Sequence, residues 1–324
     1  MTNIVHDLRE FRAPPDGIVL TIGNFDGVHV GHRLLVETTC RKARDLGVPA
    51  VVMTFEPHPI SVLFPHRAPA RLTTLTEKLA ILANLEPNYA IVLRSTPELL
   101  HETADEFLRY LVESCRPRAI IEGPTFNFGR GRQGSVDTLR AQAARYNYEV
   151  IVLDELHSSA VPGQPAVNST AIRHALRLGR VEDARQMLGR PYRITGLVSD
   201  GKHLGHTIGF PTANLERVPQ LLPGHAVYAA VGQLEDDSLH LAAVNIGPQP
   251  TFSDDHTRVE AYLLDYSGHL RTHRLGLYLL ARLRDQRRFD DVASLTEQLR
   301  RDVEAVRALA PALAELRAGP LLGL

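Results

Sequence analysis

A change of pattern near residue 190 constrains the fold of this chain more than any other feature. Before it, apolar runs alternate with amphipathic, helix-like segments; after it, closely spaced apolar runs are separated by turns. Alternating strands and helices predict a doubly wound parallel sheet, whereas consecutive short strands predict a small antiparallel barrel. With 324 residues and 44% hydrophobic content, the chain can fill two domains, each with its own core.

Hydrophobic periodicity gives the bounds of the expected elements. In the first domain, residues 1–187, strands are expected at Ile18–Ile22, Ala50–Phe55, Tyr89–Leu93, Ala119–Glu122 and Tyr148–Leu153. Helices are expected at Arg33–Leu46, Leu75–Leu85, Ala104–Ser114 and Val136–Tyr146. In the second domain, residues 188–310, strands are expected at Tyr192–Val198, Val227–Gln233, Leu239–Asn245, Val259–Leu264 and Leu275–Leu283. A helix at about 292–309 and a loosely held tail at 311–324 complete the chain.

The charge balance limits the partners that the chain can have. Its 36 Lys and Arg residues and 37 Asp and Glu residues give a formal net charge of −1, so no overall positive field exists to hold nucleic acid or an anionic membrane. We expect no targeting segment and no membrane span, because no apolar run is long enough. Cys40 and Cys115 form neither a Cys-x-x-Cys motif nor a zinc-spaced cluster, which fits a reducing cytoplasm. The sequence sets no oligomeric state.

The first candidate site is the segment Gly23–His32, which reads Gly-Asn-Phe-Asp-Gly-Val-His-Val-Gly-His and follows an expected strand. It predicts a glycine-rich turn and a helix start. His29 and His32 are three residues apart, which puts two imidazoles on one side of a turn whose backbone N–H groups already attract anions. Such groups can stabilise the charge that develops when a nucleotide α-phosphate is attacked and pyrophosphate leaves. The alternative is a solvated turn with incidental histidines.

Three further segments of the first domain could add to this site. Thr54–Pro59 ends an expected strand with polar residues between prolines, which favours a rigid loop and a plain turn equally. Gly123–Gly134 combines aromatic side chains that can flank a flat ring with arginines that can hold phosphate. Asn168–Arg173 opens a helix with capping residues and an arginine one turn in, which indicates either a capped helix or an anion site.

The second domain has a candidate site of its own. Gly201–Asn214 contains glycines and a lysine, which favour a loop that cradles phosphate, but it lacks the Gly-Lys-Ser/Thr ending of a Walker loop. Thr212 and Asn214 supply neutral oxygen ligands that suit a magnesium ion held mainly by phosphates and water. Asn245–Phe252 adds a rigid polar turn between strands. The alternative is a glycine-rich barrel loop.

Together these motifs resemble the bacterial family of bifunctional riboflavin kinases and FMN adenylyltransferases, also called FAD synthetases, over nearly the whole chain. The first domain resembles the nucleotidyltransferase module of that family through Gly23–His32, Thr54–Pro59, Gly123–Gly134 and Ser169–Arg173. The second resembles its riboflavin kinase barrel through Gly201–Leu215, Val227–Ala229, Asn245–Phe252 and Arg284–Phe289.

The resemblance implies two ATP-dependent, magnesium-requiring steps: phosphorylation of riboflavin to FMN, and adenylylation of FMN to FAD with release of pyrophosphate. It implies that the adenylyl transfer is catalysed by His29, His32 and Arg173. It implies an ATP pocket and a pyrophosphate clamp built from Gly23, Asn24, Phe25, Asp26, Ser169 and Thr170, and flavin contacts from Thr125, Asn127, Phe128 and Arg132. In the second domain, ATP and magnesium would be bound by Gly201, Gly205, Thr212 and Asn214, the last two contacting the metal.

One departure from the family pattern bears on the kinase step. The family's Arg-x-Glu-x-x-Phe stretch carries a glutamate expected to act as base on the ribityl hydroxyl, whereas Arg284–Phe289 reads Arg-Asp-Gln-Arg-Arg-Phe here. Gln286 can orient a hydroxyl at this catalytic position but cannot accept its proton, and general-base help is worth about 10²–10⁴-fold in rate. Other departures are Thr125, Asn168, His206, Ala226 and His269–Thr272.

Three functions fit these residues. The leading one is a working bifunctional enzyme, favoured by the retained Thr212 and Asn214. The second is a monofunctional FMN adenylyltransferase with a weakened or inactive kinase barrel, favoured by Gln286. The third is a non-catalytic flavin-binding regulator, against which the intact His29 and His32 pair argues. The expected partners are riboflavin, FMN, FAD and ATP, and neither nucleic acid nor a membrane.

Overall fold

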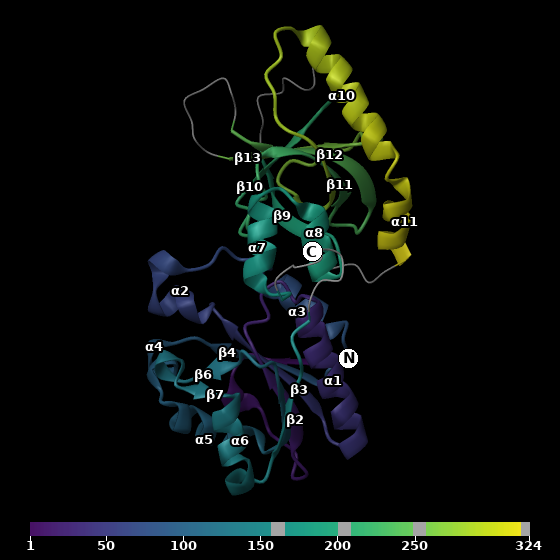
Figure 1. Ribbon diagram of the computed structural model, residues 1–324. Coiled ribbons are helices and arrows are strands. Elements are labelled where there is room, and N and C mark those ends of the chain that lie inside the picture. Colours follow the sequence, from purple (N-terminus) through teal and green to yellow (C-terminus); the bar gives the residue numbers. More distant parts are fainter. Residues whose placement is uncertain (157–165, 200–208, 249–256, 319–324) are drawn as a thin grey trace. The chain divides into compact units, whose positions relative to one another are not determined.

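The computed structural model describes residues 1–156, 166–199, 209–248 and 257–318. The chain divides into two compact units, one made of residues 1–69 and 75–167 and the other of residues 70–74 and 168–324. The first unit contains an open parallel sheet and the second a closed antiparallel barrel (Figure 1). The two architectures expected from the change of pattern are confirmed.

The first unit is built on a six-stranded sheet in which all strands are parallel. In spatial order the strands are β1 (Asn3–Val5), β4 (Tyr89–Arg94), β3 (Ala50–Glu56), β2 (Ile18–Ile22), β5 (Pro117–Glu122) and β8 (Glu149–Val152). Every residue of β2 is buried, because a central parallel strand is covered on both faces. The five expected strands are confirmed; the short edge strand β1, whose first two residues are exposed, lies outside the prediction.

The helices of this unit begin and end at local capping signals. They are α1 (Val30–Leu46), α2 (Pro59–Leu63), α3 (Leu75–Ala83), α4 (Pro97–His101), α5 (Ala104–Cys115) and α6 (Val136–Tyr146), with 3-10 turns η1 (Leu8–Glu10) and η2 (Pro65–Arg67). Gly47 ends α1 in the left-handed conformation, and Thr103 and Glu106 form a reciprocal capping box on α5. The four longer helices match the prediction, with ends shifted by a few residues.

The strand order creates a topological switch point at β2. From β2 the chain continues through β3 and β4 on one side and through β5 and β8 on the other. In open parallel sheets a ligand crevice forms beyond the carboxyl ends of the strands at such a point. Gly23–His32 and Gly123–Gly134 leave the carboxyl ends of the neighbouring strands β2 and β5, so both segments begin at the switch point.

The second unit contains a six-stranded closed barrel in which every strand pair is antiparallel. Around the barrel the strands are β10 (Ala213–Glu216), β13 (Arg258–Leu263), β12 (Leu239–Gly247), β11 (Ala226–Gln233), β14 (Arg274–Arg284) and β9 (Tyr192–Ser199). The five expected strands are confirmed. β10 is a correction, because the sequence analysis assigns Gly201–Asn214 entirely to a loop, whereas Ala213 and Asn214 pair with β13.

Two helices that precede the barrel in sequence belong to the barrel unit. They are α7 (Ser169–Arg177) and α8 (Val181–Leu188). α8 packs against β9 and β14, and the Glu182 carboxylate accepts a hydrogen bond from the backbone N–H of Arg282 at 2.8 Å. By compactness the chain therefore divides after residue 167, earlier than the boundary at 187 drawn from the sequence pattern.

The C-terminal helices pack on the barrel. They are α10 (Val292–Arg307), which Asp291 caps, and α11 (Ala310–Ala318). Leu313 and Leu316 of α11 contact the cluster that contains the buried Tyr278 and Leu280 of β14. The expectation of a loose tail is wrong for residues 311–318, because their apolar spacing provides a face that the barrel covers. Residues 319–324 lie outside the described residues.

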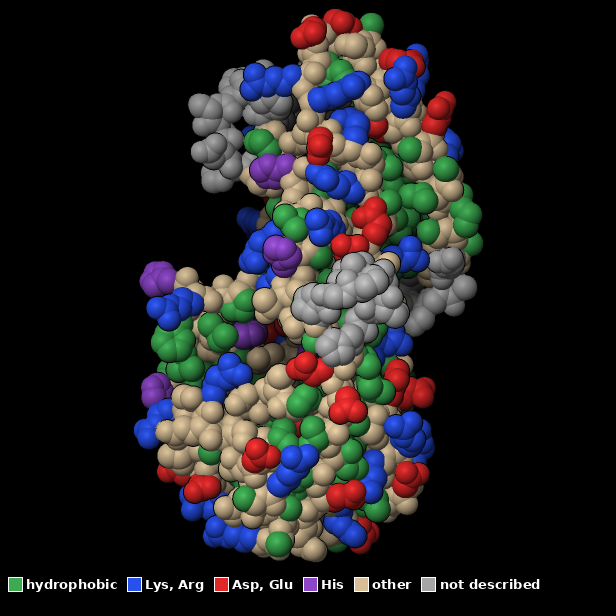
Figure 2. All heavy atoms as spheres, viewed as in Figure 1, with side chains coloured by type: hydrophobic (Ala, Val, Ile, Leu, Met, Phe, Trp, Pro, Cys, Tyr) green, Lys and Arg blue, Asp and Glu red, His purple; other side chains and the backbone are tan. Residues whose placement is uncertain are grey.

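The surface charges are mixed. Figure 2 shows Lys and Arg side chains interspersed with Asp and Glu side chains on the visible face of each unit. That face offers no extended field of one sign to a polyanion. Across the described part of the chain, every helix is too short or too polar to span a bilayer.

Candidate active sites

The turn after β2 holds its backbone in a strained conformation. Phe25 (φ 46°) and Val28 (φ 37°) have positive φ angles although neither is glycine. A β-branched residue rarely adopts this conformation, and such strain persists only where the surroundings impose it. Both side chains are fully buried, so packing fixes the shape of the turn.

The turn brings its two histidines into contact. His29 caps α1, and its Nδ1 accepts a hydrogen bond from the backbone N–H of His32 at 3.3 Å. The imidazole rings stack with centroids 3.5 Å apart and planes 19° apart. Gly31 allows the stack, because a Cβ at that position would lie 3.2 Å from the His29 ring. The expected placement of both imidazoles on one side of a helix N-terminus is confirmed.

Residues at the carboxyl end of β3 are tied to the same turn. The Thr54 hydroxyl donates to the Asn24 carbonyl oxygen at 3.2 Å. The Lys78 ammonium of α3 donates to Thr54 Oγ1 at 3.3 Å and to the Phe55 carbonyl oxygen at 3.4 Å. Both Thr54 and Lys78 are buried. The predicted polar segment Thr54–Pro59 therefore begins within β3. Its His58 caps the next helix, α2.

Glu122 links the ends of β5 and β2 at the switch point. Its Oε1 accepts a hydrogen bond from the backbone N–H of Ile22 at 2.7 Å. The side chain is 1% exposed, and burial raises the pKa of Glu122 well above its ordinary value of 4.5, against the smaller, lowering effect of the Ile22 N–H. Burial thus favours the neutral form of the Glu122 carboxyl group, which lies beside Ile22, the last residue before the Gly23–His32 turn.

The loop after β5 presents polar residues at the surface. It folds into β6 (Asn127–Phe128), η3 (Arg130–Arg132) and β7 (Gly134–Ser135). Of the expected flavin residues, Thr125, Asn127 and Arg132 are exposed, and the Asn127 amide donates to the Thr125 carbonyl oxygen at 2.6 Å. Phe128 differs, because its ring is buried 5.9 Å from the ring of Phe107 in the core. The roles of all four in flavin binding stay predictions.

The expected pyrophosphate residues lie on α7, in the barrel unit. Asn168 caps this helix, its Oδ1 accepting a backbone N–H of the first turn at 2.9 Å. Ser169 and Thr170 occupy that turn. Arg173 is buried, and its Nε donates to the carbonyl oxygen of Ala70 in the same unit at 2.7 Å. Their roles toward ATP stay predictions.

Three strands of the barrel bring polar side chains into one row. Asn214 of β10 pairs with Glu260 of β13, which also pairs with Asn245 of β12. Directly paired residues share a face of a sheet. These three are half-buried, whereas the residues beside them in each strand are buried, so the row, here called the barrel row, lies on the outer face. Asn245 Nδ2 donates to Glu260 Oε2 at 3.3 Å, and the exposed Thr212 lies just before β10.

Gln286 joins the barrel row from the segment after β14. Its Nε2 donates to Asn245 Oδ1 at 2.7 Å. The neighbouring Asp285 is exposed and pairs with Arg282. The carboxylate that lies next to Asn214 is therefore Glu260, not a residue of Arg284–Phe289.

Two family models match the chain, one for each unit's sheet. The FAD synthetase model matches residues 12–167 and the riboflavin kinase model matches residues 188–310. The curated bifunctional riboflavin kinase/FMN adenylyltransferase of Escherichia coli is 36% identical over 92% of this chain and 94% of that protein. The chain belongs to the bifunctional riboflavin kinase/FMN adenylyltransferase family. The Pseudomonas fluorescens member is 34% identical over 95% of this chain and 97% of its own length.

A solved structure shares the fold of this family member. A crystal structure from Streptococcus pneumoniae, described as a macrolide-efflux protein, has a TM-score of 0.82 and 27% identity, and the match covers 94% of this chain and 98% of that one. The gap between the two family models, residues 168–187, contains helix α7 and all of helix α8 except its last residue. The second model starts at the first residue of the expected second domain.

Sequence reasoning missed three charged residues that contact the candidate sites: Lys78, Glu122 and Glu260. Lys78 and Glu122 lie in apolar segments, where a charged residue gives no periodic signal. For Glu260 a signal exists, because it alternates with Val259 and Ala261, which are buried, and so marks an outward position on a strand. The expected ATP residues Gly201 and Gly205, together with His206 and residues 249–252 of the Asn245–Phe252 turn, lie outside the described residues.

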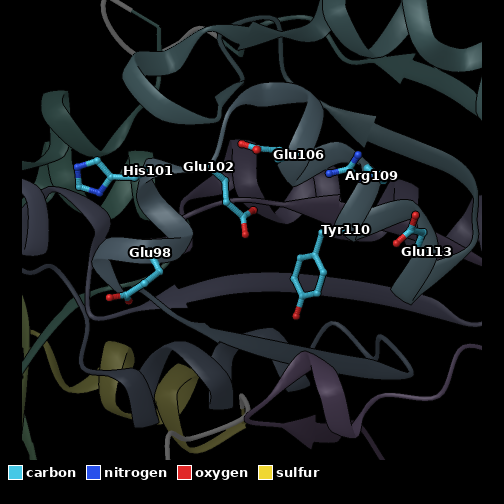
Figure 3. Close-up of a pocket in the computed structure, with 7 residues that line it drawn as sticks. All are labelled: Glu98, His101, Glu102, Glu106, Arg109, Tyr110 and Glu113. Carbon is cyan, nitrogen blue, oxygen red and sulfur yellow. The ribbon is translucent and has the colours of Figure 1, made fainter.

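A hollow of about 510 Å³ opens beside α4 and α5 in the first unit (Figure 3). It is lined by Glu98, His101, Glu102, Glu106, Arg109, Tyr110 and Glu113. Burial, together with the nearby charge of Glu106, raises the pKa of Glu102, whereas hydrogen bonds from Thr103 lower the pKa of Glu106. No residue of the family's motifs lines this acidic hollow.

Proposed function

We propose that this chain phosphorylates riboflavin to FMN and adenylylates FMN to FAD. The observation that carries the proposal is that each unit has a polar site of its own, in a chain that curated bifunctional relatives match over nearly its whole length. One site is the stacked histidine pair, and the other is the barrel row. Two separate sites suit two different phosphate-transfer reactions on one flavin.

The stacked histidines suit the adenylyl transfer. In this step an FMN phosphate oxygen bonds to the α-phosphorus of ATP while the bond to pyrophosphate breaks. Negative charge increases on the departing pyrophosphate, and His29 and His32 supply imidazole donors at the positive end of a helix. The buried, strained turn holds these donors in place before substrate arrives, and the Lys78 ammonium behind Thr54 adds a fixed positive charge.

The barrel row suits the kinase step. The terminal hydroxyl of the ribityl chain must bond to the γ-phosphorus of ATP and lose its proton, while the bond from that phosphorus to the departing ADP breaks. We assign Glu260 the role of base, because it is the carboxylate beside Asn214 on this face. Gln286 then no longer argues for an inactive barrel, and the monofunctional alternative loses its main support.

The same row suits a hard divalent cation, with Mg²⁺ as the proposed ion. Asn214, Thr212 and Glu260 offer amide, hydroxyl and carboxylate oxygens, the donor types that hold Mg²⁺ together with phosphates and water. Among the described residues, no cluster of three or more His, Cys, Asp or Glu side chains could hold a metal alone. Bound Mg²⁺ would neutralise phosphate charge during the transfer.

The proposal is tested by following both reactions in one preparation. Purified protein is incubated with ATP and Mg²⁺ and either riboflavin or FMN, and the flavins are separated by chromatography. We expect FMN and FAD from riboflavin, FAD from FMN, and neither product when EDTA replaces Mg²⁺. FAD from FMN alone would reduce the proposal to an adenylyltransferase, and the absence of any product would overturn it in favour of a flavin-binding regulator.

A further inference from the structure

Two hydrogen bonds in sequence connect α3 to the strained turn of the first unit. The Lys78 ammonium donates to Thr54 Oγ1 at 3.3 Å, and the Thr54 hydroxyl donates to the Asn24 carbonyl oxygen at 3.2 Å. An ammonium only donates hydrogen bonds, whereas a hydroxyl both donates and accepts. Lys78 therefore occupies an acceptor position of the Thr54 oxygen and leaves the Thr54 proton for Asn24. Both side chains are buried, so water competes little for these bonds.

The Asn24 carbonyl group belongs to the peptide group that precedes the strained residue Phe25. The orientation of this peptide group changes with the φ angle of Phe25, which is 46°. Residues other than glycine rarely adopt such an angle, and it persists only where the surroundings impose it. Gly23 is tied to the same strand, because its N–H donates to the Met53 carbonyl oxygen at 3.0 Å. The end of β3 thus holds the turn at two points.

The position of the Phe25 ring bears directly on His32. The ring lies against Gly23, where a Cβ would be 3.2 Å from its nearest atom. Its centroid is 5.1 Å from that of the His32 imidazole, and the two planes meet at 67° in an edge-to-face contact. Because the Phe25 side chain is fully buried, a rotation of the peptide group before it would displace the ring and the imidazole that it contacts.

We propose that Lys78 and Thr54 are positioning residues of the adenylyl transfer site, which hold the peptide group before Phe25 so that the Phe25 ring keeps His32 in place. This inference rests on the proposed function, in which His32 stabilises the departing pyrophosphate. Thr54 acts through the backbone of the turn. The positive charge that Lys78 adds is a separate effect, which the variants below distinguish from its hydrogen bond.

Substitutions of nearly equal size test the Thr54 hydroxyl. In Thr54→Val we expect kcat for FAD formation from FMN to fall about tenfold, as for the loss of one buried hydrogen bond, with KM for FMN little changed. Thr54→Ser keeps the hydroxyl and should have near-wild-type kcat. The matched control is Thr39→Val in α1, where a buried hydroxyl also donates to a carbonyl oxygen, that of Leu35, at 2.8 Å. Unchanged kcat in Thr54→Val, or an equal fall in Thr54→Ser, would overturn the proposal.

A double-substitution cycle separates the hydrogen bond of Lys78 from its charge. Lys78→Met removes the ammonium and keeps an unbranched side chain, and we expect kcat to fall about three- to tenfold. If Lys78 acts through Thr54, its removal has little further effect in the Thr54→Val background. A fall of the same size in both backgrounds would show that the charge acts on ATP directly. That result, or no fall in either background, would overturn the role of Lys78. Lys42→Met, which breaks an ion pair with Glu149, is the control.

A spectroscopic measurement tests the same contact without turnover. The Phe25 ring current shifts the signals of the His32 ring protons, so these signals report the placement of the two rings. They are recorded by proton–carbon NMR of protein labelled at its histidine rings and are identified by their loss in His32→Gln. We expect them to move in Thr54→Val and in Lys78→Met and to stay in place in Thr39→Val. Unmoved signals in the first two variants would overturn the inference.

The two proposals fail in different ways. A wild-type protein that makes no FAD from FMN would overturn the proposed function, and the NMR comparison would still decide whether Lys78 and Thr54 position the Phe25 ring. Far-UV circular dichroism shows that each variant is folded, and retained riboflavin phosphorylation shows that the barrel is unaffected.

Discussion

The two sites are assembled in opposite ways. In the first unit, the histidines, the glycine that lets them stack and the strained turn all come from the single segment Gly23–His32. In the barrel, Asn214, Glu260 and Asn245 come from three strands and meet because the register pairs them. The first kind of site depends on local backbone shape, and the second depends on strand register. Single substitutions should therefore affect the two activities separately.

The largest expected effect comes from Glu260→Gln. This change keeps the size of the side chain and its contact with Asn245 but removes the proposed base. We expect riboflavin phosphorylation to fall by about 10²–10⁴-fold, while FAD formation from FMN is unchanged. Both rates are measured by chromatography of the flavins. Glu216→Gln, an exposed position on β10, is the control, and an equal fall in both activities would contradict the separation of the sites.

A smaller but still large effect is expected from His29→Asn. Asparagine is a good N-cap residue, so α1 keeps its cap and loses only the imidazole. We expect FAD formation from FMN to fall by about 10²–10³-fold, with riboflavin phosphorylation retained. The matched control is His6→Asn at an exposed position. A loss of kinase activity alongside adenylyl transfer would show that the turn is not an independent site.

The dependence of the barrel on a buried ion pair is tested by Arg284→Met. Arg284 Nη2 lies 2.7 Å from Asp302 Oδ2, and Asp302 is 4% exposed. Removing the arginine leaves a buried carboxylate without its cation, and we expect the free energy of unfolding to fall by about 3–5 kcal/mol. Arg282→Met breaks the exposed pair with Asp285 and should cost about 0–1 kcal/mol. Urea titrations followed by far-UV circular dichroism suit a chain with no tryptophan.

The smallest effect is expected from Glu122→Gln, and it depends on pH. Because the folded-state pKa of Glu122 is raised above 4.5, the folded protein binds more protons than the unfolded chain above that pH, and stability falls as the pH rises. The substituted glutamine is not ionisable but keeps an acceptor for the Ile22 N–H. We expect equal stability below pH 4.5 and a more stable variant near neutral pH, where the folded wild type keeps a proton that the unfolded chain loses. A difference independent of pH in urea titrations would argue against a buried neutral carboxyl.

Local patterns predicted the elements better than their associations. The strands of both sheets and the histidine pair follow from periodicity and spacing, which are properties of neighbouring residues. Alternation with buried neighbours marks Glu260 as an outward strand position, but it does not show the pairing with Asn214 and Asn245 that makes this residue important. The compact unit to which helices α7 and α8 belong does not follow from local pattern for the same reason, since an amphipathic helix does not specify which sheet covers its apolar face. Helix α11 was missed because its apolar face is stabilised only by packing against the barrel.

Residues 70–74 belong to the barrel unit although the sequence on both sides of them belongs to the other unit. The Ala70 carbonyl oxygen accepts a hydrogen bond from the buried Arg173, and the Arg71 carbonyl oxygen accepts one from the backbone N–H of Leu221 at 2.7 Å. In the gene, the codons for residues 70–74 of the barrel unit therefore lie between codons for the first unit. A single recombination event near codon 168 would transfer the barrel without the short piece that holds Arg173, so exchange of modules between related genes should favour crossovers that carry both pieces together.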